Sequence, residues 1–469
     1  MRILVTPGGI VAGEARVPGN KSIAHRMLLL AAIASGRSVL RGLPAGLDVA
    51  ATAGACAALL PGAAPDLGAW MREVERRGWD EPEVEVGHEV EVEGAGRRGL
   101  RPTSATIDCR NSGTSMRLLA GLLAAAPFQA TLDGDASLRA RPMERVAEPL
   151  RRMGAGVETT DGRPPVVIRG GPLAGIRFET AVPSAQVKGA VLLAGIAAEG
   201  MTEVVEPAPT RDHTERMLSA LGAPVRSTLL DGGSRAARSP EARDQAGLQY
   251  SVTVEPFEVP AFTAGTPGDV SSAAFLAGAA VLTGGSVTVP GLGLNPSRLR
   301  FLEVLARMGA RVHHEAHGEE LGEPVGTLRV EGGRAPTGTV VTAGEQPLLL
   351  DEIPLLAVVA SAAQGETRFE GAGELRVKES DRLMGLRDLL RGLGGDADVT
   401  GDTLVVAGGG LRGGVADARG DHRMAMAAVV GACAARGPSE VRGAEAAAVS
   451  FPGFAEAMRR LGARLEVAS

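Results

Sequence analysis

The chain has 469 residues, 44% of them hydrophobic, and this length predicts two large domains with sizeable cores. It shows neither a signal peptide nor a run of about 18 apolar residues, so we expect a cytoplasmic protein that does not contact a membrane. The net charge of −6 and the aromatic content of 3% argue against nucleic-acid binding.

An apolar, Ala-rich helix that begins after a polar or small residue recurs six times along the chain. The six segments start at Asn20, Asn111, Ser184, Gly268, Asp351 and Gly420. Each shows the pattern of a capped helix start, and each is apolar nearly all round, which predicts that these helices are buried.

A second helix, ending in a variant of L-x-x-M-G-A, follows each buried helix after roughly 40 residues. The glycines at its end are Gly62 in a degraded copy, then Gly154, Gly222, Gly309, Gly394 and Gly462. Such a glycine is typical of a helix C-cap, and strand-like residues follow it. We therefore predict an α/β fold of six repeated units, three in each domain, every unit carrying two helices beside a small sheet. Polar insertions at 61–104, 227–248 and 314–326 are expected to be surface loops.

Cations gather at the starts of the predicted buried helices. Helix N-termini offer unpaired N–H groups and a positive dipole end, so converging starts predict a cleft that binds anions. Of the 49 basic residues only three are lysines, Lys21, Lys188 and Lys378. Because arginine is accepted almost everywhere else, a lysine indicates a position that needs a compact ammonium, with codon bias as the alternative.

Other motifs exclude several kinds of chemistry. The chain has no Walker A motif, no well-placed G-x-G-x-x-G and no H-E-x-x-H, and His313, His314 and His317 fall in an expected loop. Three scattered cysteines argue against a disulfide framework. The charge-dense run ELRVKESDRL resembles a solvated face, but its mixed signs beside an anion site favour a functional role. The residues alone predict a protein that binds phosphorylated ligands without a metal or an organic cofactor.

Ten segments, in order along nearly the whole chain, resemble the 5-enolpyruvylshikimate-3-phosphate synthase family. They are PGNKSIAHR, NSGTSMRLLAG, RARPM, SAQVKGAVLLAG, TRDHTERML, GDVSSAAFLAGA, DEIPLLAV, ELRVKESDRL, GDHRMAMA and SFPGF. The resemblance implies a two-domain inside-out α/β barrel with three units around a pseudo-threefold axis in each domain. One domain would hold residues 1–19 plus 256–469, and the other residues 20–255. We expect a monomer, although the sequence itself does not reveal the oligomeric state.

The resemblance also implies an activity. An enzyme of this family transfers the enolpyruvyl group of phosphoenolpyruvate to the 5-hydroxyl of 3-phosphoshikimate and releases phosphate, on the pathway to chorismate and the aromatic amino acids. One alternative is a UDP-N-acetylglucosamine enolpyruvyl transferase, which uses a cysteine in a mobile loop, whereas Cys109 precedes a helix start. The other is a non-catalytic phosphometabolite-binding protein, against which the presence of Lys21, Asp351 and Glu379 argues.

Site residues follow from the resemblance position by position. Those implied for 3-phosphoshikimate are Lys21, Ser22, Arg26, Ser184, Ala185, Gln186, Arg211, Asp351 and Lys378. Those implied for phosphoenolpyruvate are Lys21, Gly113, Arg141, Gln186, Arg382 and Arg423. Asp351 matches the base at the shikimate hydroxyl, and Glu379 and Lys21 match proton-transfer positions. Which group carries which proton stays open.

Five positions bear on how closely the chain follows the family. His25 replaces a common Asn, Ala185 replaces a frequent second Ser, and Val449 replaces a phosphate-binding Lys of some members. Gly113 is expected to leave room for glyphosate in the phosphoenolpyruvate pocket. Leu118 falls at a nearby position that can alter this response, so the sequence leaves sensitivity open.

Overall fold

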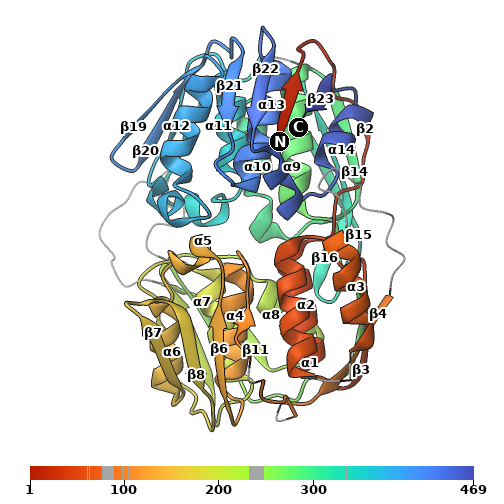
Figure 1. Ribbon diagram of the computed structural model, residues 1–469. Helices are drawn as coiled ribbons and strands as arrows, with labels where there is room; N and C mark the ends of the chain where they lie inside the picture. The colour runs from red at the N-terminus through yellow and green to blue at the C-terminus, as the bar shows by residue number, and fades with distance from the viewer. Residues whose placement is uncertain are drawn as a thin grey trace.

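The computed structural model describes residues 1–60, 62, 64–76, 89–97, 99–103, 105–231, 248–333 and 335–468. It forms two lobes, one above the other, and both chain ends lie in the upper one (Figure 1). We call the lower lobe the N-lobe; its hydrophobic core contains residues between Ile23 and Ala264. The upper lobe is the C-lobe, whose core joins Ile3, Val5 and Val11 to residues from Val270 onward.

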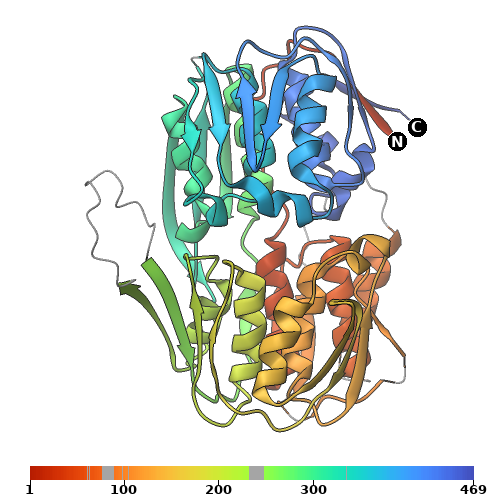
Figure 2. The ribbon, with the colours of Figure 1, turned by 90° about the vertical axis from the view of Figure 1, so that its left-hand side faces the viewer.

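The N-lobe contains eight helices and eleven strands among the described residues. The helices are α1 (Lys21–Ala32), α2 (Leu47–Leu59), α3 (Pro65–Arg76), α4 (Gly113–Leu123), α5 (Ala136–Arg139), α6 (Glu144–Met153), α7 (Ala185–Gly195) and α8 (His213–Ala220). The strands are β3 (Ser35–Arg41), β4 (Glu89–Ala95), β5 (Ile107–Asp108), β6 (Gln129–Asp133), β7 (Gly156–Thr160), β8 (Arg163–Arg169), β9 (Arg177–Glu179), β10 (Thr202–Glu206), β11 (Val225–Asp231), β12 (Leu248–Val254) and β13 (Thr263–Gly265). They form three sheets in the orders β13-β3-β4, β5-β6-β8-β7 and β11-β12-β10-β9. The buried helices α1, α4 and α7 stand side by side among these sheets (Figure 2).

The C-lobe repeats this arrangement. Its helices are α9 (Val270–Thr283), α10 (Arg300–Arg307), α11 (Ile353–Ser361), α12 (Arg382–Gly392), α13 (His422–Ala434) and α14 (Phe454–Arg460). Its strands are β1 (Arg2–Val5), β2 (Gly13–Glu14), β14 (Ser286–Gly293), β15 (Arg311–Glu320), β16 (Glu323–Glu331), β17 (Val340–Val341), β18 (Glu366–Phe369), β19 (Asp396–Thr400), β20 (Thr403–Ala407), β21 (Gly414–Asp417), β22 (Ser439–Arg442) and β23 (Leu465–Ala468). The sheet orders are β15-β16-β14-β2, β17-β18-β20-β19 and β21-β22-β1-β23. The six small sheets with their helices confirm the predicted α/β architecture of six units.

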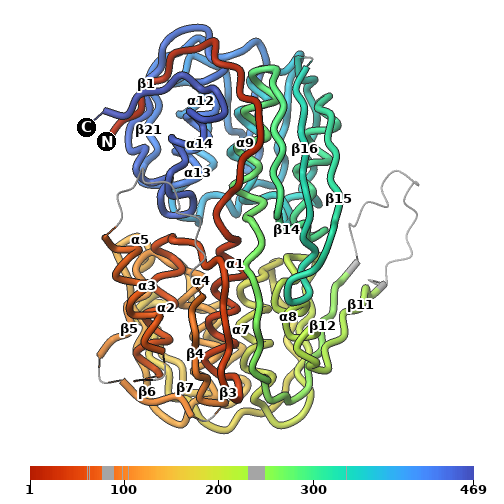
Figure 3. The backbone as a smooth tube through the Cα atoms, turned by 90° about the vertical axis from the view of Figure 1, so that its right-hand side faces the viewer, coloured from red at the N-terminus to blue at the C-terminus, as the bar shows by residue number. Residues whose placement is uncertain are grey.

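The chain crosses between the lobes at two neighbouring points. Gly19 leads from the C-lobe into α1, Gly268 leads back into α9, and the two glycines form an isolated β-bridge. Figure 3 shows both segments running side by side between the lobes. The first crossing also explains why β1 lies between β22 and β23, with which it pairs antiparallel.

The predicted glycine C-caps are confirmed in five of the six units, where the glycine is the C-cap residue or directly follows it, whereas Gly62 lies two residues beyond Leu60, the C-cap residue of α2. The glycines after the second helix of each unit have positive φ angles: Gly62 (81°), Gly154 (114°), Gly222 (96°), Gly309 (102°), Gly394 (76°) and Gly462 (105°). In this left-handed conformation a side chain would crowd the backbone, so glycine ends the helix at little cost.

The loop predictions for the insertions are partly wrong. Residues 61–104 include α3, which buries Leu67, Trp70 and Val74 on one face, and β4. Residues 314–326 form part of the β15–β16 hairpin, so His313, His314 and His317 lie on a strand. That strand is exposed along nearly its whole length and therefore lacks the alternating apolar pattern that reveals a half-buried strand. Of 227–248, residues 232–247 lie outside the described residues.

Candidate active site

One cleft is lined by residues of both lobes, at the level where the six buried helices begin. Its wall includes Lys21 of α1, Thr114 of α4, Ala185 of α7, Ser271 of α9, Asp351 just before α11, and Arg423 of α13. The convergence of helix starts that the sequence predicts is thus confirmed. Each start presents the positive end of a helix dipole, so the cleft favours anions.

Side chains cap five of these helices at their first turn, α7 among them through Ser184 Oγ, which accepts from Val187 N at 3.4 Å. The Asn20 side chain accepts from the backbone N–H groups of Ser22 and Ile23, at 2.9 and 3.2 Å. The other capping contacts are Ser112 Oγ with Ser115 N (3.2 Å), Asp269 Oδ2 with Ser272 N (3.0 Å) and Asp421 Oδ1 with Arg423 N (2.9 Å). These caps fix the backbone at the cleft wall, because they satisfy N–H groups that have no partner within the helix.

Two arginines of the N-lobe flank Gly113. Arg117 donates to the side-chain oxygen of Gln186, and Arg141 Nη2 donates to Asn111 Oδ1 at 2.5 Å. A Cβ atom at position 113 would lie 3.1 Å from Arg117 Nη1 and 3.2 Å from Arg141 Nη1. Burial, followed by the charge of Arg141, lowers the pKa of Arg117 to about 10, so it remains a cation at neutral pH. Glycine is therefore what lets two guanidinium groups share this corner.

Lys21 lies at the start of α1 with its Nζ 3.0 Å from Asp48 Oδ2. Burial alone would raise the pKa of Asp48, but the charge of Lys21 is the main influence that opposes burial, and the pKa is lowered. Arg26, one turn further along α1, is buried and does not line the cleft. It donates to Ser22 O at 2.8 Å and to Thr214 Oγ1 at 2.7 Å, and so supports the start of α1 from behind.

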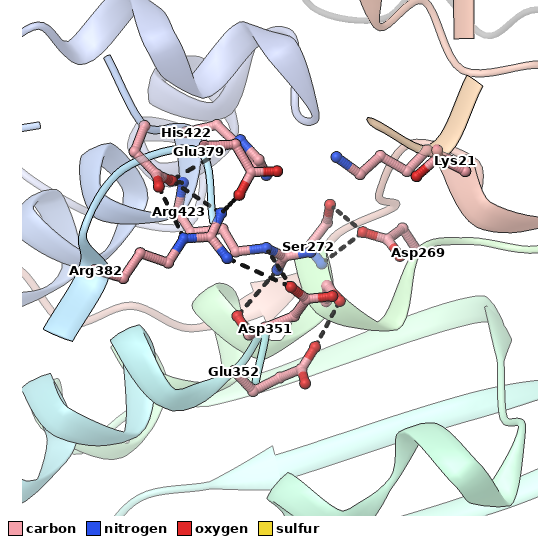
Figure 4. Close-up of polar contacts among 12 residues, drawn as sticks. Lys21, Asp269, Ser272, Asp351, Glu352, Glu379, Arg382, His422 and Arg423 are labelled. Atoms are coloured by element: carbon pink, nitrogen blue, oxygen red, sulfur yellow. Dashed lines mark hydrogen bonds and ion pairs between the residues drawn. The ribbon is translucent and has the colours of Figure 1, made fainter. Parts of the chain in front are cut away.

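Asp351 is surrounded by three arginines. Its carboxylate pairs with Arg211 of the N-lobe, with Arg423 Nε at 3.3 Å and with Arg382 Nη1 at 3.5 Å. Figure 4 shows Arg382 and Arg423 directed at Asp351 from the same side. Burial would raise the pKa of Asp351, but the arginine charges outweigh burial and hold this pKa well below its ordinary value. The carboxylate is therefore ionised.

Glu379 faces the cleft from the other side of Arg382. Its Oε2 lies 2.6 Å from Arg382 Nη2 and its Oε1 lies 3.7 Å from Arg141 Nη1. Burial is again outweighed, chiefly by Arg382, and the pKa of Glu379 lies well below its ordinary value. The Lys21 side chain points toward Glu379 across the cleft (Figure 4). The Arg382 side chain is 1% exposed and also pairs with Asp421 at 2.8 Å. Arg382 therefore fixes the carboxylates of Asp351 and Glu379 from behind the wall.

Lys378 lines the cleft beside these carboxylates. Burial lowers its pKa to about 8, although the charges of Asp351 and Glu379 oppose that shift. The Lys378 ammonium therefore loses its proton in mildly alkaline solution.

The structure brings the predicted site residues together. All of them line the cleft except Arg26 and Arg382, which lie directly behind its wall. The family-derived list omitted further wall residues, including Asp48, Thr210, Asp269, Ser271, Arg298 and Glu374. Arg298 shows why: it belongs to no motif, and tertiary contacts place its Nη2 2.5 Å from Ser271 Oγ and 2.8 Å from Glu352 Oε1. Val449 is not a wall residue.

The cysteines and the metal-ligating residue types offer no second kind of chemistry. Cys56, Cys109 and Cys433 are free and buried, and burial raises the pKa of Cys56 to about 12 and raises that of Cys109 as well. A buried neutral thiol is a poor nucleophile. Within the described ranges, no three His, Cys, Asp or Glu residues are grouped to hold a metal ion. In the same residues no helix has the length and apolar character to cross a bilayer.

Comparisons with known proteins agree with one another. The family model for EPSP synthase (3-phosphoshikimate 1-carboxyvinyltransferase) matches residues 5–458. The 3-phosphoshikimate 1-carboxyvinyltransferase of Acidithiobacillus ferrooxidans is 44% identical, with 100% of this chain and 99% of the relative covered. That of Halorhodospira halophila is 45% identical, with 99% and 96% covered. An EPSP synthase structure from Acinetobacter baumannii superposes with a TM-score of 0.80 at 36% identity, covering all of both chains. The enolpyruvyl transferase NikO from Streptomyces tendae, 18% identical, shares the fold with a TM-score of 0.72, covering 99% of this chain and 98% of NikO.

Proposed function

Because the chain belongs to the EPSP synthase family, the 3-phosphoshikimate 1-carboxyvinyltransferases, we propose that its interlobe cleft binds phosphoenolpyruvate and 3-phosphoshikimate. The chain is a transferase of the shikimate pathway, which moves the enolpyruvyl group to the 5-hydroxyl of 3-phosphoshikimate and releases phosphate. One observation carries the assignment of the site. Six helix starts, a set of cations and two partly buried carboxylates meet in one cleft.

The chemistry needs these groups. Phosphoenolpyruvate must gain a proton at its methylene carbon, which leaves a cation-like centre for the 5-hydroxyl to attack. The tetrahedral adduct then loses phosphate. An acid, a base and strong clamps on two polyanions are therefore required.

The N-lobe wall is suited to hold 3-phosphoshikimate. Lys21 and Ser22 open α1, Ser184, Ala185 and Gln186 open α7, and Arg211 precedes α8. Together they offer two positive helix ends, hydroxyl groups and an arginine to a phosphate. Lys378 and Asp351 reach the same space from the C-lobe. In our assignment Arg26 acts through the backbone of Ser22.

Phosphoenolpyruvate fits the space between the arginines. Gly113 keeps that space open beside Arg141, with Lys21 and Gln186 also on the wall, and Arg382 and Arg423 close it from the C-lobe. A substrate carboxylate or phosphate would exchange with Asp351 and Glu379 as partner of these arginines. Such an exchange needs little rearrangement, because arginine binds either anion through the same fork.

The exchange also prepares the acid and the base. The nearby arginines hold the pKa of Asp351 and of Glu379 down. When a substrate anion neutralises those cations, both pKa values rise toward a range in which the groups accept and return protons. Asp351 then acts as base at the 5-hydroxyl, and Glu379 or Lys21 delivers the proton to the methylene carbon.

We also propose the setting in which the enzyme works. All six helix starts of the cleft come from one chain, which supports a monomer. Three free cysteines suit the reducing cytoplasm. The separate cores of the two lobes support two domains with the first boundary after residue 19. The expected second boundary at 255/256 needs a correction, because Val259 and Ala264 belong to the N-lobe core and β13 pairs with β3 of the N-lobe. We therefore place the second boundary after Gly265.

A phosphate-release assay tests the function. The purified chain should release phosphate only when phosphoenolpyruvate and 3-phosphoshikimate are both present. UDP-N-acetylglucosamine as acceptor should give no release above background. Phosphate release with that acceptor, or no release with either, would contradict the assignment.

A further inference from the structure

Of the three lysines, Lys188 alone does not line the cleft. Its side chain is 0% exposed, and its Nζ lies 2.8 Å from Glu206 Oε2 and 2.8 Å from Glu215 Oε1. The Tyr250 ring completes the surroundings, with its centroid 5.1 Å from the ammonium. Burial lowers the pKa of Lys188, but Glu215 and Glu206 outweigh burial and raise it above its ordinary value. The charge is therefore retained.

The two glutamates differ in what else they hold. Glu206 ends β10, and its Oε1 accepts from the backbone N–H of Ser184 at 2.9 Å. The Thr210 hydroxyl lies 3.0 Å from Oε1 and 2.8 Å from Oε2 of the same carboxylate. Glu215, on α8, pairs with Lys188, and within the described residues it hydrogen-bonds no residue of the cleft wall.

Besides Lys188, the described residues that donate to Glu206 are Ser184 and Thr210, and both line the cleft. Ser184 is the N-cap of α7, where its hydroxyl accepts from Val187 N at 3.4 Å, and Thr210 directly precedes Arg211. One buried carboxylate therefore joins the start of a phosphate-facing helix to the segment that carries an arginine of the site. Lys188 fixes that carboxylate, since a buried charge must keep its counter-ion.

We propose that Glu206, held by Lys188, is a positioning residue for 3-phosphoshikimate. It sets the backbone at Ser184 and the side chain at Thr210, so that the start of α7 and Arg211 address one phosphate. The inference rests on the proposed function of the cleft.

Two single variants test it as a matched pair. In Glu206→Gln, a carboxylate with two accepting oxygens becomes an amide with one accepting oxygen and a donating NH₂ group. Either the Ser184 N–H or the Lys188 ammonium then loses its acceptor. The KM for 3-phosphoshikimate should rise about tenfold, the effect of roughly one buried hydrogen bond, while kcat and the KM for phosphoenolpyruvate stay within about twofold. Glu215→Gln removes the same charge beside the same lysine, so it should lower the unfolding temperature similarly and leave both KM values unchanged. Equal KM values for 3-phosphoshikimate in the two variants would overturn the proposal.

A second pair serves if a single variant does not fold. These are two double variants that share Lys188→Gln: one adds Glu215→Gln and the other adds Glu206→Gln. Each double variant removes one cation and one anion. Only the double variant with Glu206→Gln should raise the KM for 3-phosphoshikimate. The same KM in both double variants would again reject the positioning role. The unmodified enzyme separates this result from the assignment of the cleft. If it fails to release phosphate with both substrates, the proposed function fails, whereas turnover without the split in KM rejects the role of Glu206 alone.

Discussion

The two walls of the cleft differ in the partners of their arginines. In the N-lobe wall, Arg117 and Arg141 donate to the neutral side chains of Gln186 and Asn111. In the C-lobe, Arg382 pairs with Asp351, Glu379 and Asp421, and Arg423 pairs with Asp351. On the first wall these two guanidinium groups thus have neutral side-chain partners on their own lobe, whereas Lys21 pairs with Asp48. The second contains the carboxylates that can exchange protons.

Among the described residues of the cleft, three ion pairs join the walls, and in each the cation belongs to the N-lobe and the carboxylate to the C-lobe. They are Arg211 with Asp351, Arg141 with Glu379 and Arg145 with Glu374. The contrast indicates that the two lobes have different roles. The N-lobe is built to hold anions, and the C-lobe to supply counter-ions and proton transfer.

Removing the carboxylates should produce the largest effect. We expect Asp351→Ala and Glu379→Gln each to lower kcat by at least about a hundredfold, because each removes a group that moves a proton. Lys21→Ala should match them, which would extend the proton chemistry to the N-lobe wall. Steady-state phosphate release measures these rates, with circular dichroism to confirm folding. Near-normal rates in all three variants would refute the residue assignment.

A side chain at position 113 should weaken substrate binding more than chemistry. In Gly113→Ala the new Cβ pushes against two guanidinium groups, so the KM for phosphoenolpyruvate should rise about tenfold, equivalent to roughly 1.4 kcal/mol. Inhibition by glyphosate should weaken in parallel. Gly171→Ala is the matched control, because nothing lies within 4 Å of its added Cβ. If millimolar glyphosate leaves the unmodified enzyme uninhibited, the pocket does not accept it.

The pH dependence should isolate Lys378. Its lowered pKa of about 8 means that the ammonium is present below pH 8 and is lost above it. We expect kcat/KM for 3-phosphoshikimate to fall as pH rises through about 8, because that parameter reports the free enzyme. In Lys378→Arg the fall should disappear, since a guanidinium keeps its charge. An unchanged profile in this variant would assign the alkaline limb to another group.

The pair at the rim should matter least. Arg145 Nη1 lies 3.2 Å from Glu374 Oε2, and both side chains are more than a third exposed. Such pairs contribute about 0–1 kcal/mol, so Glu374→Gln should change kcat/KM less than about fivefold. The difference in kcat/KM between this variant and the unmodified enzyme should be smaller at high salt than at low salt, because salt screens the pair. A large loss would give the rim a role in catalysis.

The architecture could be predicted from sequence because its units repeat. Apolar helices with polar starts and glycine ends recur with local signals that need no tertiary information, and the six-unit fold followed from them. The β15–β16 hairpin could not be found in this way, since its exposed strand carries His313, His314 and His317 without an apolar face. By contrast α3 was predictable, because Leu67, Trp70 and Val74 are spaced three and four residues apart.

The site divides along the same line. Residues at helix starts were predictable, because the dipole argument applies wherever a helix begins. The direction of Lys188 was not predictable. Residues three and four apart on a helix share a face, so its spacing from Ala185 and Ser184 would direct it to the cleft, whereas it pairs with two buried glutamates. Arg298 and Asp48 were not predictable either, since only long-range packing brings their segments to the cleft.

The crossings at Gly19 and Gly268 are joined by a β-bridge, so they would be the pivot of any rotation of one lobe against the other. Displacement grows with the length of the lever arm, and Lys21 and Asp269 directly follow the crossings, so they shift little. The backbone oxygen of Glu379 accepts from Ser137 Oγ of α5 at 3.3 Å. Helix α5 lies away from the crossings (Figures 1 and 3), so Glu379 would move through a longer arc. A substrate seated against Lys21 would meet the same ammonium at every angle. It would meet Glu379 only when the rotation is complete.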